Sequence, residues 1–340
     1  ELTVRDAQHD IVELRVQPRH GAARRLVAGL HPDPAARRAA WEARTAAGAV
    51  FEPALRALAA QRNAAAVGYG FADYTGLGMF AAGLEDLPEL DLPPERSGAP
   101  WDITFTRDHA TRTLLKRHFT ADRLGEMALD TLAQLGLPLD GITLDLVPRA
   151  GKSEHAWCVP VDPPLDIRVL ANAADGVEAW QTVFHELGHA AHARYVQGAT
   201  FLLRDSPNAA MNEAVAQSTA WIVYDRPWLE GALGLTAGEA DAVVTYGDEK
   251  RRQAVRWQLL WSRLEPELYA GADVTARYWE LAEQLLGVTA DARTRQVPAW
   301  AKLIHFVTNP MYLQNYLIAD LAANQLRGAA GDDLGGFLKE

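Results

Sequence analysis

The sequence predicts a mainly α-helical protein with one small β-sheet. The chain has 340 residues, of which 49% are hydrophobic and 23% are charged, as in ordinary folded globular proteins. Helix-favouring Ala, Leu, Glu and Arg are frequent, and apolar residues recur at intervals of three and four. Alternation typical of strands is confined to residues 142–170. A chain of this length can bury a large core, in one domain or in two.

The N-terminal part is predicted to form helices that are separated by a loop. Residues 34–67 have a helical pattern, in which Pro53 marks a kink or a break between two helices. Residues 85–100 are rich in proline and acidic residues, which is typical of a loop. This loop is the best candidate for a sub-domain break within a single domain of residues 1–340. A pair of helices is predicted over 106–135.

The strand signal lies directly before a long helical region. Residues 142–146 alternate apolar and polar side chains, as a half-buried strand does. Residues 155–161 and 166–170 are predicted to pair with this strand and to be joined by the turn Asp162-Pro163-Pro164. From Val177 the helical pattern continues almost to the end of the chain.

Charge and cysteine content exclude several classes of protein. The chain has 33 Lys and Arg residues against 44 Asp and Glu residues, so its net charge of −11 argues against nucleic acid as a partner. No apolar run is long enough to cross a membrane. Cys158 is the only cysteine, which excludes an intrachain disulfide and favours a reducing, cytoplasmic location. The first residue is Glu1 rather than Met, and a removed signal peptide stays open.

A metal-binding pattern lies within the helical region. His185-Glu186-Leu187-Gly188-His189 matches the HExxH signature of zinc metallopeptidases. Residues four apart share one helix face, so the two imidazoles can bind a single ion. Glu186 can then reach a water on that ion and act as its general base. We expect one Zn²⁺ per chain.

A catalytic zinc site needs a third protein ligand. One known pattern would put a histidine six residues after His189, but Tyr195 stands there. The alternative is a carboxylate on a second helix, and Glu213 is the only acidic residue in the helical run over 209–224. We therefore predict Glu213 as the third ligand. His192 is interpreted as a supporting histidine, and Cys158 as an inert core residue.

These residues resemble a known family. HELGHAAH followed by NEAVAQ is similar to the angiotensin-converting-enzyme family of peptidyl-dipeptidases and, more distantly, to the thimet-oligopeptidase family. Residues 41–74, 153–157 and 288–316 resemble further segments of the first family, so the likeness covers most of the chain. It implies a gluzincin-type catalytic core of long helices, with a small sheet beside the active-site helix.

The resemblance also implies roles for single residues. It gives zinc binding to His185, His189 and Glu213, and proton transfer to Glu186. His305 would hydrogen-bond the oxyanion of the reaction. Tyr316 is our choice for a second oxyanion donor and Tyr312 for substrate binding, although the spacing leaves the two tyrosines interchangeable. The backbone at His155 and Ala156 would pair with an extended substrate, as strand edges do, and the side chain of His155 would add a contact.

This chain departs from the family at several positions. Gln217 stands where the family has an Asp that supports a zinc ligand, and Leu303 stands where a Lys binds the substrate carboxylate. Strict release of dipeptides is therefore in doubt. Gln314 and Asn315 replace a chloride-binding Arg, so we expect no activation by chloride. Members are also longer at the N-terminus, where helices roof the cleft. Either the cleft is open, or a partner chain or second copy completes it.

We interpret the sequence as that of a zinc peptidase of the peptidyl-dipeptidase or oligopeptidase type. Zinc would activate a water, Glu186 would take its proton, and His305 and Tyr316 would stabilise the oxyanion. One alternative is a zinc amide hydrolase that is specialised for a small metabolite or a modified peptide. Another is a zinc-containing protein that binds peptides without cleaving them. A purely structural zinc site needs no base, so Glu186 argues against the last alternative.

Overall fold

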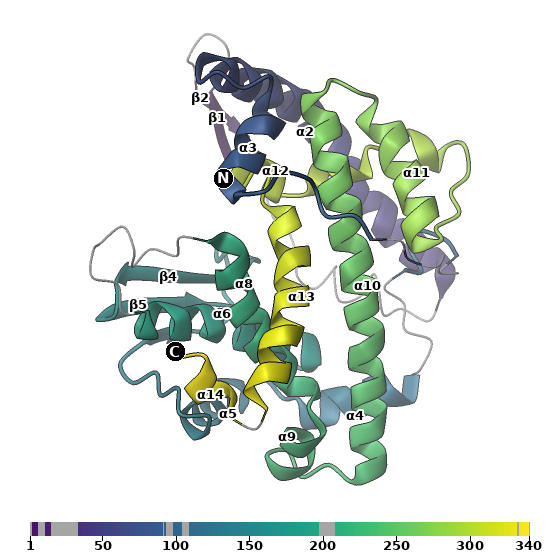
Figure 1. Ribbon diagram of the computed structural model, residues 1–340. Coiled ribbons are helices and arrows are strands. Elements are labelled where there is room, and N and C mark those ends of the chain that lie inside the picture. Colours follow the sequence, from purple (N-terminus) through teal and green to yellow (C-terminus); the bar gives the residue numbers. More distant parts are fainter. Residues whose placement is uncertain are drawn as a thin grey trace. The chain divides into compact units, whose positions relative to one another are not determined.

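A computed structural model describes residues 2–5, 11–14, 33–90, 92, 98–103, 109–196, 208–331 and 333–339 (Figure 1). The fold is mainly α-helical with a small sheet, as predicted. Contacts divide the chain into unit 1, Glu1–Thr106 with Leu260–Tyr312, and unit 2, Arg107–Leu259 with Leu313–Glu340. The single domain and its break over 85–100 stay predictions, and residues 91 and 93–97 of that loop lie outside the described residues.

Unit 1 is built on the long helix α2, Pro34–Gly68. The side chain of Asp33 caps its first turn by accepting a hydrogen bond from the Ala35 N–H at 2.9 Å. Of the two alternatives predicted at Pro53, a kink or a break, the break is absent, because α2 continues through this residue. Leu55 and Ala59 are buried after the proline, as Thr45 is before it, so packing on both sides holds the helix together.

The other elements of unit 1 come from both of its segments. They are β1 Leu2–Arg5, β2 Ile11–Leu14, α3 Tyr74–Ala82, the last part of α10 Ala237–Tyr269, α11 Val274–Leu286, η2 Thr294–Gln296, η3 Ala299–Lys302 and α12 His305–Thr308. β1 and β2 pair as antiparallel strands, a hairpin that the sequence analysis did not predict.

Unit 2 holds the second sheet and most of the remaining helices. Its elements are α4 His109–His118, α5 Leu124–Gln134, β3 Thr143–Asp145, β4 Trp157–Asp162, β5 Asp166–Leu170, α6 Val177–Tyr195, α8 Ala209–Ala220, η1 Trp221–Tyr224, α9 Arg226–Gly231, the first part of α10, α13 Leu313–Ala330 and α14 Leu334–Phe337. The helical region predicted from Val177 onward is confirmed.

The three strands of unit 2 lie in the order β3-β5-β4. β4 and β5 form the predicted antiparallel hairpin, in which Cys158 lies opposite Val169, and β3 runs parallel to β5. β4 begins two residues later than predicted. The reason is that Ser153 Oγ accepts a hydrogen bond from the N–H of His155 at 3.1 Å and donates one to its carbonyl at 3.0 Å, which engages that backbone in a turn.

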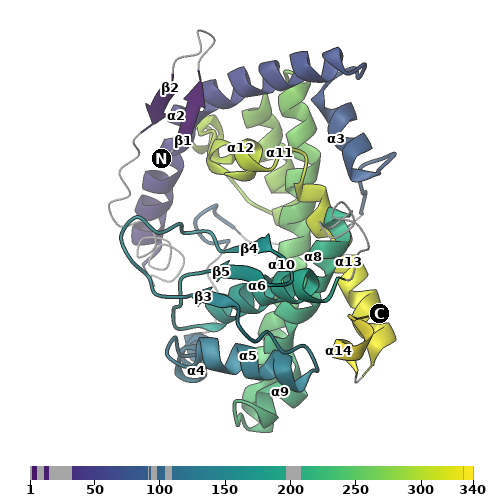
Figure 2. The ribbon, with the colours of Figure 1, turned by 90° about the vertical axis from the view of Figure 1, so that its left-hand side faces the viewer.

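The helix α6 packs along one face of this sheet and contacts both β4 and β5 (Figure 2). Its buried face carries Trp180, Val183, Phe184 and Leu187, which belong to the core of unit 2. The ring of Phe184 meets that of Trp228 edge to face, with centroids 5.6 Å apart. Burial of this apolar face fixes the rotation of α6 about its axis and turns another face towards α8.

Within the described residues, no helix is long and apolar enough to span a membrane.

Candidate metal centre

The two histidines of the HExxH pattern lie next to each other on α6. His185 and His189 are one turn apart and half-buried, and their Nε2 atoms are separated by 3.1 Å. Their rings are almost perpendicular, with centroids 4.7 Å apart. The spacing of four therefore gives the shared face that the sequence analysis expected.

The helix α8 crosses α6 at a very short distance. A Cβ atom on Gly188 would lie 2.6 Å from Ala216 Cα and would also clash with the hydroxyl of Thr219. That hydroxyl donates a hydrogen bond to the Phe184 carbonyl at 2.8 Å. Only glycine allows the two backbones to come this close. The crossing brings Glu213, one turn earlier on α8, over the two histidines.

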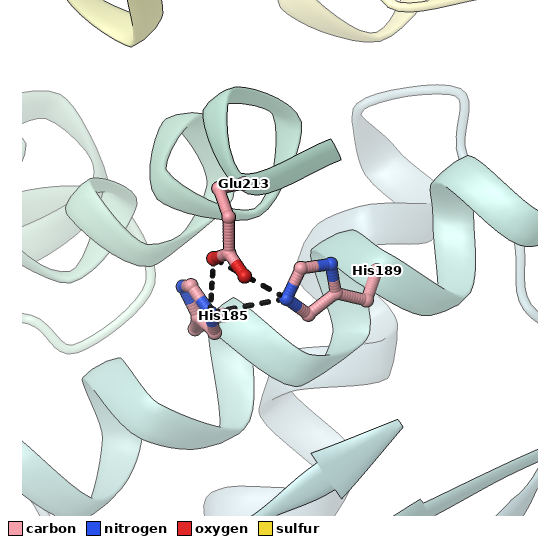
Figure 3. A group of neighbouring side chains, drawn as sticks. All are labelled: His185, His189 and Glu213. Atoms are coloured by element: carbon pink, nitrogen blue, oxygen red, sulfur yellow. Dashed lines mark hydrogen bonds and ion pairs between the residues drawn. The ribbon is translucent and has the colours of Figure 1, made fainter. Parts of the chain in front are cut away.

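Glu213 completes a cluster of three donors (Figure 3). Its Oε2 lies 3.3 Å from His185 Nε2 and 3.6 Å from His189 Nε2. The carboxylate is only 4% exposed. Its ligand atom and those of the histidines all lie within 4.8 Å of one another.

This donor set fits a zinc ion. Zinc binds His nitrogen and carboxylate oxygen at about 2.0 to 2.1 Å in a tetrahedron, which separates neighbouring ligand atoms by about 3.3 Å. The separations of 3.1, 3.3 and 3.6 Å in this cluster match that requirement. Three protein ligands leave a fourth position for water or substrate, as in catalytic rather than structural sites.

The surroundings shift the pKa values of the two histidines in opposite directions. Burial disfavours the charged form of His185, but the hydrogen bond and the charge of Glu213 outweigh burial and raise its pKa. Burial and the nearby His185 lower the pKa of His189 to about 4. His189 is therefore neutral at pH 7, the form in which an imidazole can bind a metal.

Asn212 supports the second histidine, a role that the sequence analysis missed. Its Oδ1 lies 2.9 Å from His189 Nδ1. An amide oxygen can only accept, so Nδ1 carries the proton and Nε2 keeps its lone pair for a ligand. In the sequence, the only indication of this role is that an amide stands directly before Glu213. The role can be recognised only when α8 is known to lie over α6.

Glu186 is buried beside the cluster without belonging to it. It is 8% exposed, and burial raises the pKa of its carboxyl to about 7. The positive charge of His185 and the backbone of Cys158 act against this shift. A carboxyl group with a pKa near 7 can both take and return a proton at neutral pH.

Tyr316 is a further predicted site residue that belongs to unit 2. It lies on α13, which packs closely against α8. Burial raises the pKa of Tyr316, and the charges of Glu213 and Glu186 raise it further. The phenol is therefore protonated at neutral pH, with its hydroxyl available as a donor.

His305 and Tyr312 belong to unit 1. The guanidinium of Arg62 donates hydrogen bonds to the backbone oxygens of Phe306 and Val307, at 2.5 and 2.8 Å. These bonds hold the turn that carries His305. Tyr312 follows Met311, whose N–H donates to Glu265 Oε1 at 2.7 Å. The functional roles of the two residues stay predictions.

The remaining candidates lie around the cluster. Ala156 precedes β4 directly, and the backbone of His155 is bonded to Ser153, so pairing of this segment with a substrate stays a prediction. Burial raises the pKa of the Cys158 thiol to about 12, which fits an inert core cysteine. His192 lies outside the donor cluster, and burial lowers its pKa.

Comparison with known proteins identifies the fold. No protein-family model matches the chain, and no curated protein matches it either. Among solved structures, the chain resembles PZ peptidase A, with a TM-score of 0.61 and 14% identity over 90% of this chain. It also resembles a putative oligoendopeptidase F, with a TM-score of 0.64 and 17% identity over 93% of this chain. The likeness covers 61% and 64% of those two chains. The chain thus has a fold found in peptidases, and the closer kinship to peptidyl-dipeptidases stays a prediction.

Proposed function

We propose that this protein is a zinc-dependent peptidase of the peptidyl-dipeptidase or oligopeptidase type. The observation that carries the proposal is the meeting of His185, His189 and Glu213, with the buried carboxyl of Glu186 beside them. The fold shared with two peptidases supports the same reaction class. A non-catalytic centre would not require a buried base next to its ligands.

The roles of the residues follow from their chemistry. A zinc ion bound there would polarise the scissile carbonyl and lower the pKa of a water molecule. Glu186 takes the proton of the attacking water and delivers it to the leaving amine, which its pKa of about 7 allows. Tyr316 donates a hydrogen bond to the oxyanion, a type of contact that contributes about 3 to 4 kcal/mol. Asn212 keeps the ring of His189 oriented.

The experiment that tests the proposal combines metal content with turnover. We expect mass spectrometry to find about one zinc per chain in the wild type and in Glu186→Gln, but little in Glu213→Ala. A panel of quenched fluorescent peptides should be cleaved by the wild type and not by Glu186→Gln. Mass spectrometry of the products distinguishes release of dipeptides from internal cleavage.

Each unexpected outcome contradicts a different part of the proposal. Full zinc in Glu213→Ala would mean that the third ligand is another residue. Turnover by Glu186→Gln with zinc present would overturn the role of the base. A zinc-loaded wild type that cleaves no peptide would favour a hydrolase of a specialised amide.

A further inference from the structure

Met311 has an unusual backbone conformation. Its φ angle is 54°, and in the described part of the chain it is the only residue other than glycine with a positive φ angle. Residues with a side chain are disfavoured in this left-handed region, so the conformation persists only where the surrounding structure imposes it. Such residues cluster at functional sites. The strain at Met311 therefore calls for an explanation in terms of function.

Two contacts within unit 1 impose this conformation. The Met311 N–H donates a hydrogen bond to Glu265 Oε1 at 2.7 Å, and Glu265 is only 1% exposed. The second contact is with Gly78 of α3, where a Cβ atom would lie 2.5 Å from Met311 Cβ and 2.7 Å from its Cγ. Glycine thus lets the buried Met311 side chain lie against the backbone of α3. Met311 is held by its N–H and by its side chain at the same time.

The carboxylate that holds Met311 belongs to a wider hydrogen-bond network. The Tyr269 hydroxyl donates to Glu265 Oε1 at 3.3 Å and accepts a hydrogen bond from Arg62, also at 3.3 Å. The same guanidinium donates to two backbone carbonyls of α12, as described above. One network of three side chains therefore fixes both ends of the segment 306–311.

Glu265 itself is incompletely paired. Among the described residues, its Oε2 has no hydrogen-bond partner, although the carboxylate is buried. A buried acceptor without a partner lowers stability, and in a native structure it calls for an explanation. Two unfavourable features, the unpaired oxygen of Glu265 and the strain at Met311, thus meet at one hydrogen bond. Departures of this kind from the most stable arrangement are expected where a protein functions.

The residue that follows Met311 is Tyr312, the last residue of unit 1. The two backbone dihedral angles of a residue determine the path of the chain after it. The left-handed conformation of Met311 therefore sets the direction of Tyr312 relative to the network. Tyr312 is half-buried, and a phenol offers a peptide both an apolar ring and a hydrogen-bond donor.

We propose that Glu265 is a positioning residue for substrate binding. It holds Met311 in the left-handed conformation and so fixes the orientation of Tyr312, which binds the peptide. A contact that is oriented before the substrate arrives loses less freedom on binding. This inference rests on the proposed function and deepens it, because it assigns to unit 1 a network that orients a substrate contact.

The test is peptide cleavage by the purified full-length wild type, Glu265→Ala, Tyr312→Phe and the double variant. We expect KM to rise about 10-fold in each single variant with kcat little changed, since one hydrogen bond to the substrate is lost or misplaced. If Glu265 acts through Tyr312, the double variant shows no larger rise than Tyr312→Phe alone. Glu265→Gln keeps an acceptor oxygen for the Met311 N–H and should have a KM near that of the wild type.

The matched control is Asp273→Ala. Asp273, also in unit 1, accepts a hydrogen bond from the Ala276 N–H at 3.0 Å at the start of α11. Its loss weakens a backbone contact away from Met311, so KM should stay unchanged. Zinc content is measured on the same samples and should equal that of the wild type, because the three metal donors belong to unit 2.

Three outcomes would overturn the inference: a wild-type KM in Glu265→Ala, a wild-type KM in Tyr312→Phe, or additive effects in the double variant. If Glu265→Ala does not fold, Glu265→Asp takes its place, because its carboxylate is one methylene shorter and draws back from the Met311 N–H. A wild type that binds no zinc or cleaves no peptide would instead contradict the proposed function.

Discussion

Three of the buried carboxylates in the described residues have different surroundings, and these surroundings determine the chemistry of each. Glu213 lies next to two imidazoles, and its negative charge stabilises positive charge at this place. Burial keeps the pKa of Glu186 near 7, so its carboxyl group can take up and release a proton at neutral pH. Glu265, in unit 1, also has a pKa of about 7 because of burial, but it holds the backbone of Met311. Environment rather than residue type decides the role.

Tyr316 is expected to act in turnover and not in metal binding. We predict that Tyr316→Phe keeps its zinc and lowers kcat about 100- to 1,000-fold, because one donor to the oxyanion is lost. Peptide cleavage and metal content measured on the same sample check this. Tyr195→Phe is the control, since the hydroxyl of Tyr195 donates to the Pro138 carbonyl. Unchanged kcat in Tyr316→Phe would remove the residue from the mechanism.

Glu265 is expected to make stability depend on pH. The pKa of its carboxyl is raised from 4.5 to about 7 in the folded state, mainly by burial. The folded protein therefore binds a proton more tightly than the unfolded chain, and the charged form opposes folding above pH 7. We predict that Glu265→Gln is more stable than the wild type at pH 8 by roughly 1 to 3 kcal/mol.

The gain should shrink towards pH 5, where Glu265 of the wild type is protonated in the folded state. Urea unfolding at both pH values measures the difference. Glu249→Gln, at an exposed position on the same helix, is the control and should show no such pH dependence. A variant that is less stable than the wild type at pH 8 would show that the charge of Glu265 is needed to hold Met311.

At the level of elements, the metal donors are brought together by the crossing of α6 and α8. The sequence patterns predict both helices, because apolar periodicity is a local signal. They also indicate Glu213, the only acid in its helix. The support at Asn212 could not be predicted, because it depends on which face of one helix meets another. At Pro53 the sequence left a kink and a break open, and buried residues on both sides of the proline keep α2 as one helix.

Gly188 is expected to control the crossing. We predict that Gly188→Ala destabilises the fold by about 1 to 3 kcal/mol, because the new methyl group collides with the backbone of Ala216. It should also weaken zinc binding, since α8 carries Glu213. Thermal unfolding and zinc titration measure the two effects.

The control for this substitution is Gly328→Ala, on α13. A Cβ atom at Gly328 would meet nothing within 4 Å, so this variant should gain up to about 1 kcal/mol of stability. Gly188→Ala with normal zinc affinity would mean that the two helices can separate without moving Glu213.

At the scale of the whole molecule, the predicted functional residues are divided between the two units. The three donors, Glu186 and Tyr316 belong to unit 2, whereas His305 and Tyr312 belong to unit 1. Unit 2 also contains α13, which lies near the C-terminal end of the sequence and packs against α8. The chain spans 61% and 64% of the two solved structures that it resembles. Completion of the cleft by a partner chain or a second copy stays a prediction.

Removal of metal is expected to lower the stability of the whole chain. A ligand that binds only the folded state stabilises it by about 4 kcal/mol at a concentration of 1,000 times its Kd. We predict that a strong chelator lowers the midpoint of thermal unfolding and that added zinc restores it. Glu213→Ala should respond to neither addition. Equal midpoints for the wild type with zinc and with chelator would contradict the proposed centre.

The close crossing of α6 and α8 also makes the centre a compact target for protein design. The three donors, the buried base and the Asn212 support all lie on two helices of 19 and 12 residues. One contact, between Gly188 and Ala216, sets the spacing of the donors. A designer who transfers these two helices with that contact would carry the ligand geometry into another helical scaffold.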